Sequence, residues 1–591
     1  MSFRFSPRPN RAHEIRWREW GSEAFAEARD RDMPVLLGIS GIWCHWCHVM
    51  DETTYSDPEV IRLVNERYVP IRVDNDERPD VNRRYNLGGW PTTAFLTPDG
   101  EIIHGGTYVP PEAMRGLAGQ ISDLWRVKKD DLTARVAELR AKEREEEAPA
   151  PGDLAWDVVD QVASLVRGQY DPKFGGFGRE PKFPQPALLR LLLAEHRRHG
   201  YPDVAAMLHK TLGAMAAGGT YDPVEGGFFR YSTTRDWSVP HFEKMLEDNS
   251  ELLSVYAEAH RTFPEAGYDR VARDVIRWMD AVLWRDDVKA FAGSQDADEH
   301  YYALDAAERA KHERPFVDRT IYTGWNALAA SAYVAAFRAL GDRALDARAH
   351  DTVHTISTRL HRRDPRVVFH FDRGDGPQVP DLLADLAALL AAAIDAYETG
   401  LHPVGLGFAE ALAEHLCARL EDGEGGGFFD APERDEPGRV SRREKPIEDN
   451  ALAADALLRL AALTGEARWR TAAERALRLF VGDHRRWGQF AAAYAEAVAR
   501  ALTAPLVAVV VGPADDRLTA SLWERALAAD DPARSLHRLV PGRDAAILER
   551  LGYPGRTAAY VCVGTVCSAP LEDAAALDGE LARARARHER S

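Results

Sequence analysis

Two cysteines separated by two residues lie near the start of the chain, in the sequence Cys44-His45-Trp46-Cys47, and His48 follows them directly. This spacing has three chemical interpretations: a thiol–disulfide redox pair, an attachment site for a c-type haem, and half of a zinc site. Haem attachment normally accompanies export, and zinc needs further ligands that do not lie nearby in the sequence. With five cysteines in 591 residues, the chain is not a disulfide scaffold, which favours a reactive pair.

The segments around this pair predict the order of elements of a thioredoxin-like domain. Apolar runs at 34–40 and 68–74 indicate buried strands, and a helical pattern follows the cysteines to about Tyr55. Beyond Pro91, two further strands are expected at 92–97 and 101–106, joined by a Pro-Asp-Gly turn that is typical of a hairpin.

The predicted position of the cysteines gives each of them a chemical role. A thiol at a helix N-terminus is acidified by the helix dipole, and a neighbouring His45 would lower its pKa further. We therefore expect Cys44 to be the exposed attacking thiolate and Cys47 to be the more buried resolving thiol. Trp43 directly precedes the pair and is expected to contact the substrate. Pro91 occupies the position where thioredoxins place a cis proline beside the cysteines, and it is expected to take part in catalysis. The alternative is a redox-silent module whose cysteines serve only in packing.

A charged stretch at 140–152 predicts a linker, and an almost wholly helical pattern follows it. The domains are therefore expected at 1–145, 153–503 and 504–591. Long and short connections alternate between the helices, which places every long loop at one end of a six-hairpin (α/α)6 barrel. Twelve helices are predicted, at 154–170, 186–199, 202–217, 241–262, 268–284, 324–340, 344–361, 381–400, 405–422, 450–465, 468–484 and 488–503.

Polar and aromatic residues cluster at these long loops, which also repeat a Gly-Gly-Phe turn in residues 170–178, 221–232 and 421–430. Carboxylates can act as acid and base, and aromatic faces stack on a sugar ring. On the helix predicted at 241–262, His241, Lys244 and Asp248 would share a face. The alternative for each charged residue is solvation or helix capping. Catalysis is expected from His241, Glu243, Asp248, Asp296 and Asp298. Ligand contacts are expected from Lys182, Phe183, Arg230, Lys244, Asn249, Trp325, Asn326, Glu448, Asp449 and Asn450.

The last segment and the overall composition bound the remaining possibilities. Apolar strands near residues 505–511 and 558–563 predict a small α/β appendage, in which Cys562 and Cys567 are expected to be ordinary thiols, with a disulfide as the alternative. A net charge of −18 argues against nucleic-acid and anionic-membrane surfaces. No apolar run of signal-peptide or membrane-span length is present, so a cytoplasmic protein is expected. No cofactor or metal is expected.

Several motifs together resemble one known family. The segments GIWCHWCHVM, DNDERPDVNRRYN, GGWPTTAFLTPDGEIIHGGTYVPP, GGFGREPKFP, VPHFEKMLEDN and SQDADEHYY are similar to those of the spermatogenesis-associated thioredoxin-domain family. The resemblance covers nearly the whole chain. It implies an N-terminal thioredoxin-like domain and an (α/α)6 barrel similar to those of N-acylglucosamine 2-epimerases and six-hairpin glycosidases. It also implies a redox role for Cys44 and Cys47, and a link to carbohydrate metabolism through the barrel.

Two classes of function follow from these patterns. The first is a thiol–disulfide oxidoreductase acting on a protein disulfide, with a barrel that binds or processes a small sugar-like ligand. The second is a sugar epimerase, isomerase or glycoside hydrolase whose thioredoxin-like module is redox-silent. A non-enzymatic scaffold is the remaining alternative, because similarity of fold does not carry chemistry with it.

Overall fold

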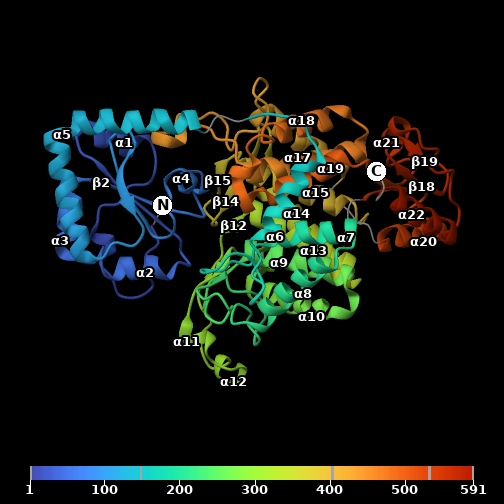
Figure 1. The fold of residues 1–591 in the computed structure, drawn as a ribbon, viewed down its shortest axis with the longest axis horizontal. Coiled ribbons are helices and arrows are strands. Elements are labelled where there is room, and N and C mark those ends of the chain that lie inside the picture. The colour runs from blue at the N-terminus through green and yellow to red at the C-terminus, as the bar shows by residue number, and fades with distance from the viewer. Residues whose placement is uncertain (1–2, 147–149, 401–404, 530–533, 589–591) are drawn as a thin grey trace.

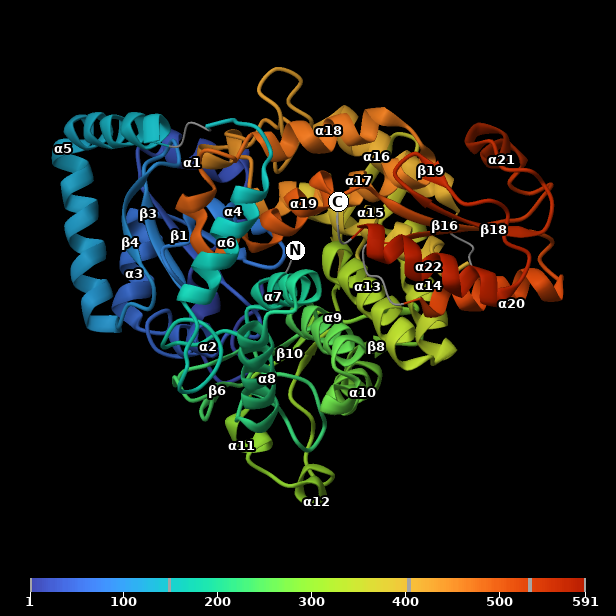
Figure 2. The ribbon, with the colours of Figure 1, turned by 45° about the vertical axis from the view of Figure 1, so that its right-hand side comes forward.

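The computed structural model describes residues 3–146, 150–400, 405–529 and 534–588. Three units follow one another along the chain (Figure 1). A thioredoxin-like unit lies at one side, a helical barrel forms the middle, and a small α/β unit lies at the opposite side. Figure 2 shows the same order, with β1 and β3 far from β16 and β18. The fold class that the sequence predicted is therefore confirmed.

The N-terminal unit is built on a four-stranded sheet in the order β2-β1-β3-β4. Strand β1 runs parallel to β2 and antiparallel to β3, so the strand–helix–strand–hairpin order of the prediction is correct. Separate apolar clusters pack on the two faces of this sheet. The strands are β1 (Val35–Ser40), β2 (Val69–Asp74), β3 (Thr92–Leu96) and β4 (Ile102–Gly106); the helices are α1 (Ser22–Asp30), α2 (His45–Glu52), α3 (Pro58–Arg67), α4 (Pro79–Tyr85) and α5 (Pro111–Glu146).

The linker predicted at 140–152 is wrong in its first half. Helix α5 continues to Glu146, with one break in its helical dihedral angles at Lys128. The sequence RAKEREE consists of strong helix formers, so charge alone did not end the helix. Residues 147–149 of the predicted linker lie outside the described residues.

The barrel consists of two concentric rings of helices. The inner helices pack in the closed order α7-α9-α13-α15-α17-α19, and each outer helix precedes an inner one in the chain. The inner ring comprises α7 (Pro186–His199), α9 (Leu246–Thr262), α13 (Thr323–Leu340), α15 (Leu383–Tyr397), α17 (Ile447–Thr464) and α19 (Ala492–Leu502). The outer ring comprises α6 (Trp156–Gly168), α8 (Pro202–Ala217), α10 (Tyr268–Trp278), α14 (Arg343–Arg359), α16 (Leu406–Leu420) and α18 (Ala467–Arg478). The long loops lead into the N-terminal ends of the inner helices, as the alternating connections predicted.

One error in the predicted helices concerns residues 241–245, which are extended. The short strand β6 (Pro240–His241) pairs with β5 (Tyr231–Ser232), and β7 (Lys244–Met245) pairs with β10 (Ser294–Gln295). Helix α9 begins after Met245, whose backbone is extended. The partner strands lie in other loops, so helical spacing within this segment could not reveal the pairing. His241 and Lys244 therefore do not share a helix face with Asp248.

Three of the long loops share one structural motif, a Gly-Gly-Phe turn held by a lysine–aspartate ion pair. In the second copy Lys244 Nζ donates to Asp222 Oδ2 at 2.7 Å and to the Gly226 carbonyl at 2.8 Å. The first copy uses Lys182 with Asp171, and the third uses Lys445 with Asp422. At Gly226, φ is +88° and a side chain would collide with the Asp274 carbonyl, so glycine is required there.

Ion pairs join five of the six neighbouring pairs of inner helices deeper in the barrel. In each pair the two helices contribute opposite charges, so this part of the lining is polar but locally neutral. The pairs are Arg190–Glu251 and Arg197–Glu258 between α7 and α9, Arg338–Glu398 between α13 and α15, Arg459–Asp395 between α15 and α17, Arg500–Asp455 between α17 and α19, and Arg190–Glu496 between α7 and α19.

The C-terminal unit contains a second four-stranded sheet, in the order β17-β16-β18-β19. Its strands are β16 (Leu506–Val511), β17 (Ser535–Leu539), β18 (Ala558–Val563) and β19 (Val566–Cys567), and its helices are α20 (Arg517–Ala528), α21 (Ala545–Leu551) and α22 (Ala574–His588). Residues 530–533 and 589–591 of the predicted appendage lie outside the described residues. Among the described helices, none is long and apolar enough to cross a membrane.

Candidate functional site

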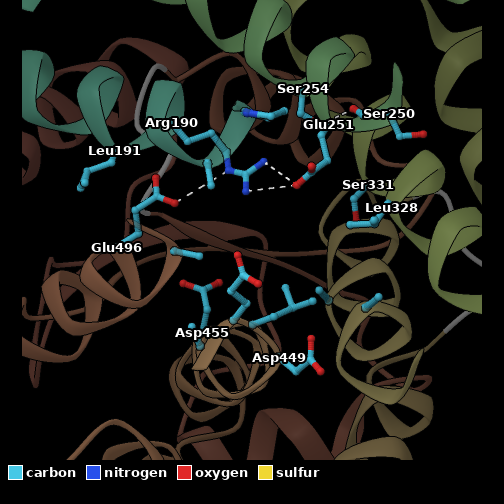
Figure 3. Close-up of a pocket in the computed structure, with 18 of the residues that line it drawn as sticks. Arg190, Leu191, Ser250, Glu251, Ser254, Leu328, Ser331, Asp449, Asp455 and Glu496 are labelled. Atoms are coloured by element: carbon cyan, nitrogen blue, oxygen red, sulfur yellow. Dashed lines mark hydrogen bonds and ion pairs between the residues drawn. The ribbon is translucent and has the colours of Figure 1, made fainter. Parts of the chain in front are cut away.

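A cavity of about 1100 Å³ fills the barrel axis and reaches the thioredoxin-like unit. Trp43, Asp76 and Trp90 of that unit line one end of it, together with residues at the N-terminal ends of the inner helices. Figure 3 shows part of the cavity lining, where Arg190 reaches toward Glu251 and Glu496, and Ser254 and Ser331 come from the neighbouring helices α9 and α13. The thioredoxin-like unit is therefore the roof of the barrel cavity, and the two units share one site.

Two pairs of adjacent carboxyl groups lie at the roofed end of the cavity. Glu247 and Asp248 are in the first turn of α9, while Glu448 and Asp449 are in the first turn of α17. In the inner ring two helices separate α9 from α17 on either side, so the pairs come from opposite walls. The segments LEDN and IEDN are thus two copies of one local arrangement.

The surroundings raise the pKa of all four carboxyl groups. Burial raises the pKa of Asp248 to about 6 against the opposing effect of Arg230, and it raises the pKa of Glu448 to about 7, assisted by Asp449. Burial also raises the pKa values of Glu247 and Asp449. Glu247 and Glu448 are exposed residues, but both line the cavity. The surrounding protein therefore still limits the solvation of their carboxyl groups. Near neutral pH the site can therefore hold both protonated and ionised carboxyl groups.

Three tryptophans and one arginine complete the roofed end. The Arg230 guanidinium lies 4.4 Å from the Trp43 ring centroid and 4.9 Å from that of Trp90. Trp325 lines the cavity from α13. Trp43 Nε1 donates to Asp76 Oδ2 at 2.6 Å, which fixes the indole against the cavity. The roofed end of the cavity therefore combines aromatic faces with a cation that lowers the pKa values of the α9 carboxyl groups.

His370 and Asp385 form a further pair on the cavity wall. His370 Nδ1 lies 2.8 Å from Asp385 Oδ2, and its Nε2 lies 2.7 Å from the Asp76 carbonyl oxygen. Burial opposes the charged imidazole, but Asp385 outweighs it and the pKa of His370 is raised. This histidine thus joins the barrel wall to the roof. The sequence prediction missed His370, Asp385 and Asp76, because they meet only through the packing of the two units.

The cysteine pair is placed differently from the prediction. Cys44 and Cys47 form a disulfide, and Cys44 caps α2, its Sγ accepting the Cys47 N–H. The two residues are 4% and 3% exposed, and they pack with Met245 of the barrel. The expectation that Cys44 is exposed, and more so than Cys47, is therefore wrong in this structure, because the barrel covers the helix start. The Trp90–Pro91 peptide bond beside the pair is cis.

A second group of predicted residues lies at the seam between the units. His241 Nδ1 lies 2.5 Å from Glu243 Oε2, and the His241 ring faces His45 with a centroid distance of 6.4 Å. Phe183 belongs to the same seam, where it stacks on Tyr231. None of the predicted residues His241, Glu243 or Phe183 lines the described cavity.

The two aspartates that follow β10 also lie outside the cavity lining. Asp296 is buried, and burial raises its pKa to about 7. Asp298 is exposed and accepts the Tyr301 N–H as the cap of α11 (Glu299–Tyr302). Capping, the alternative interpretation of a charged residue near a helix start, thus describes Asp298.

Five residues that were predicted to contact a ligand instead bond to other groups of the protein. Lys182 and Lys244 are buried in the ion pairs of the Gly-Gly-Phe loops. Asn249 is buried and bonds both the N–H and the carbonyl of Phe228. Asn326 does the same for Phe291, and Asn450 for Phe428. The repetition of these asparagines near helix starts was visible in the sequence. In the structure it reflects a repeated hydrogen-bond arrangement that holds each loop to its helix.

The fold and the site define a thioredoxin-like domain joined to a six-hairpin (α/α)6 barrel. Residues 8–143 match the family model described as Thioredox_DsbH, a protein of unknown function, DUF255, and this segment carries that domain. The chain is 36% identical over 305 residues to an uncharacterized protein of Caenorhabditis elegans, covering 48% of this chain and 41% of that protein. It is 35% identical over 311 residues to spermatogenesis-associated protein 20 of Mus musculus, covering 48% and 39%. The family resemblance seen in the motifs is therefore confirmed, with the matched part spanning about two fifths of these relatives.

Several solved structures resemble the barrel. Cellobiose 2-epimerase from Bacillus thermoamylovorans is 11% identical, with 56% of this chain and 87% of that chain covered and a TM-score of 0.45. A D-mannose isomerase is 10% identical, with 59% and 99% covered and a TM-score of 0.47. At these identities and TM-scores the likeness bears on neither substrate nor activity.

Proposed function

We propose that the barrel is an acid–base enzyme for a small, neutral, hydroxyl-rich ligand of sugar type, with the thioredoxin-like domain as the roof of its site. The observation that carries this proposal is the pair of opposed carboxyl clusters, Glu247/Asp248 and Glu448/Asp449, at the roofed end of one cavity. A carboxyl group with a pKa near the working pH is an effective proton donor or acceptor. The tryptophans of the roof supply apolar faces of the kind that pack against sugar rings.

The opposed arrangement favours a reaction that exchanges a proton at carbon. In the open-chain form of a reducing sugar, the carbon next to the carbonyl is acidic. An ionised carboxylate on one wall can accept its proton, and a protonated carboxyl on the other wall can return one to the opposite face. The result is epimerisation, with no net change in protons or electrons. Asp248, with a pKa of about 6, suits the base, and Glu448, with a pKa of about 7, suits the acid.

The cysteines fit a structural role better than exchange with a protein disulfide. A disulfide is attacked at an accessible sulfur, and both Cys44 and Cys47 are covered. Their bond lies directly after Trp43, which forms part of the roof. We therefore propose that this disulfide stabilises the roof.

Proton exchange with deuterated solvent tests the proposed function. A panel of reducing sugars is incubated with the purified protein in D₂O, and loss of the proton next to the carbonyl carbon is followed by NMR. We expect incorporation into at least one sugar, reduced at least a hundredfold in Asp248→Asn and in Glu448→Gln, on the scale of general acid–base catalysis. The control Glu299→Gln changes an exposed carboxylate outside the cavity and should retain the wild-type rate. Hydrolysis of a glycoside without deuterium incorporation would mean that the site is a hydrolase and not an epimerase. If neither incorporation nor hydrolysis is observed with any sugar, the proposal is refuted.

A further inference from the structure

A second disulfide joins Cys562 to Cys567 in the C-terminal unit, which corrects the expectation of ordinary thiols. The two residues are directly opposite each other on β18 and β19, at the end of a hairpin that turns through Gly564 and Thr565. This bond lies on the side of the molecule opposite to the thioredoxin-like domain (Figure 1). It therefore needs an explanation separate from that of Cys44 and Cys47.

The two cysteines of this bond differ in their exposure to solvent. Cys567 and the hairpin residues before it are exposed, and Val566 retains 64% of its accessible surface. Cys562 is buried at 5% exposure, on the face of β18 that also carries Ala558 and Tyr560. A thiolate from solution can therefore reach the Cys567 sulfur and not the Cys562 sulfur.

The buried sulfur also has a hydrogen-bond donor. Tyr553 Oη lies 3.3 Å from Cys562 Sγ, and because a disulfide sulfur carries no proton, the tyrosine O–H must be the donor. When the bond breaks at Cys567, negative charge develops on Cys562 Sγ, and this donor is already in place to stabilise it. A stabilised leaving thiolate departs faster.

We propose that Cys562–Cys567 is the disulfide-exchange site of this chain, open to dithiols, with Cys567 as the attacked sulfur and Cys562 as the leaving thiolate. One thiolate of the dithiol forms a bond to Cys567 Sγ, and the bonding pair of the old disulfide leaves on Cys562, which takes a proton from solvent. The second thiol of the dithiol then attacks the mixed disulfide and releases the Cys567 thiol. The protein disulfide is reduced by two electrons, and the dithiol is oxidised to its own disulfide.

The order of reduction tests this proposal on the unmodified full chain. The protein is incubated with increasing dithiothreitol, quenched with iodoacetamide, digested and analysed by mass spectrometry. We expect Cys562 and Cys567 to be alkylated at least tenfold faster than Cys44 and Cys47. Reduction of Cys44–Cys47 first, or of both bonds at one rate, would overturn the assignment.

Two matched tyrosine variants test the role of the hydrogen bond. Tyr553→Phe removes the donor to Cys562 and should slow reduction of Cys562–Cys567 about tenfold, the scale of one hydrogen bond to a charged group. Tyr560→Phe is the control. The Tyr560 ring lies next to that of Tyr553, and the Tyr560 hydroxyl is buried and has no hydrogen-bond partner among the described residues. An equal rate in wild type and Tyr553→Phe, with both variants folded by circular dichroism, would remove Tyr553 from the mechanism and contradict the proposed leaving-group assistance.

Discussion

The repeated lysine of the Gly-Gly-Phe loops allows one structural idea to be tested twice within a single chain. In the second loop Lys244 and Asp222 are both completely buried, whereas in the third loop the Lys445 and Asp422 side chains retain 15% and 24% exposure. Substitution by methionine keeps the length of the side chain and removes its charge and donors. The same chemical change is thus made in a dry and in a partly hydrated setting.

The expected loss of folding free energy differs between the two substitutions, because water can solvate the remaining aspartate only in the third loop. Breaking a buried pair costs roughly 3–5 kcal/mol, and a partly exposed pair contributes roughly 1 kcal/mol. Asp222 keeps a second cation, since Arg309 Nη1 lies 2.7 Å from its Oδ2, so we take the lower end for Lys244→Met, about 3 kcal/mol. Lys445→Met should cost about 1 kcal/mol.

Calorimetry of the barrel transition measures this difference. For a unit of about 350 residues, a loss of about 3 kcal/mol lowers Tm by roughly 4 °C and a loss of about 1 kcal/mol lowers it by roughly 1 °C. Hydrogen exchange at the Gly226 and Phe228 amides should rise in Lys244→Met more than exchange at the corresponding amides rises in Lys445→Met. Equal shifts for the two variants, or a larger one for Lys445→Met, would refute the role assigned to burial.

Three further predictions follow from single contacts. Replacing Arg230 by Gln removes a cation that lowers the pKa of Asp248, so the acidic limb of the proposed reaction should move up by ~1 pH unit; an unmoved limb would separate Arg230 from Asp248. His537 is buried with its pKa lowered to about 4, so the unfolded chain binds its proton first on acidification. Its neutral form therefore contributes stability that is lost as pH falls from 6.5 to 4, about 3 kcal/mol in all, and denaturation of His537→Gln across this window should lack that loss. Asn249→Ala leaves both backbone groups of Phe228 without their partner and should cost about 3 kcal/mol in chemical denaturation, whereas a cost below about 1 kcal/mol would contradict the anchor role.

The elements of both main domains could be predicted because their signals are local. Apolar runs marked β1 and β2, and the alternation of long and short connections marked the two-ring barrel. The chemistry was harder to predict because it depends on contacts between distant segments. Met245 packs against Cys44 although the two residues are about two hundred positions apart, and no local sequence pattern near either residue predicts this contact.

The candidate site shows the same division between local and distant information. Asp248, Glu448 and Asp449 were predicted from their position at helix starts, and they do line the cavity. Lys244 and Asn249 stood beside them in the same motif, but their side chains turn into the loop and are used up there. Residue type and spacing identified the cluster, while the direction of each side chain depended on tertiary packing.

The pH dependence of deuterium incorporation into a reducing sugar tests the central claim most directly. If an ionised Asp248 accepts the proton and a protonated Glu448 supplies one, the rate should rise through about pH 6 and fall above about pH 7. The two limbs belong to the coupled site as a whole, and loss of either carboxyl group should remove the bell shape. A rate that rises steadily into alkaline solution, or that is unchanged in Asp248→Asn, would contradict the proposed role of the opposed carboxyl groups.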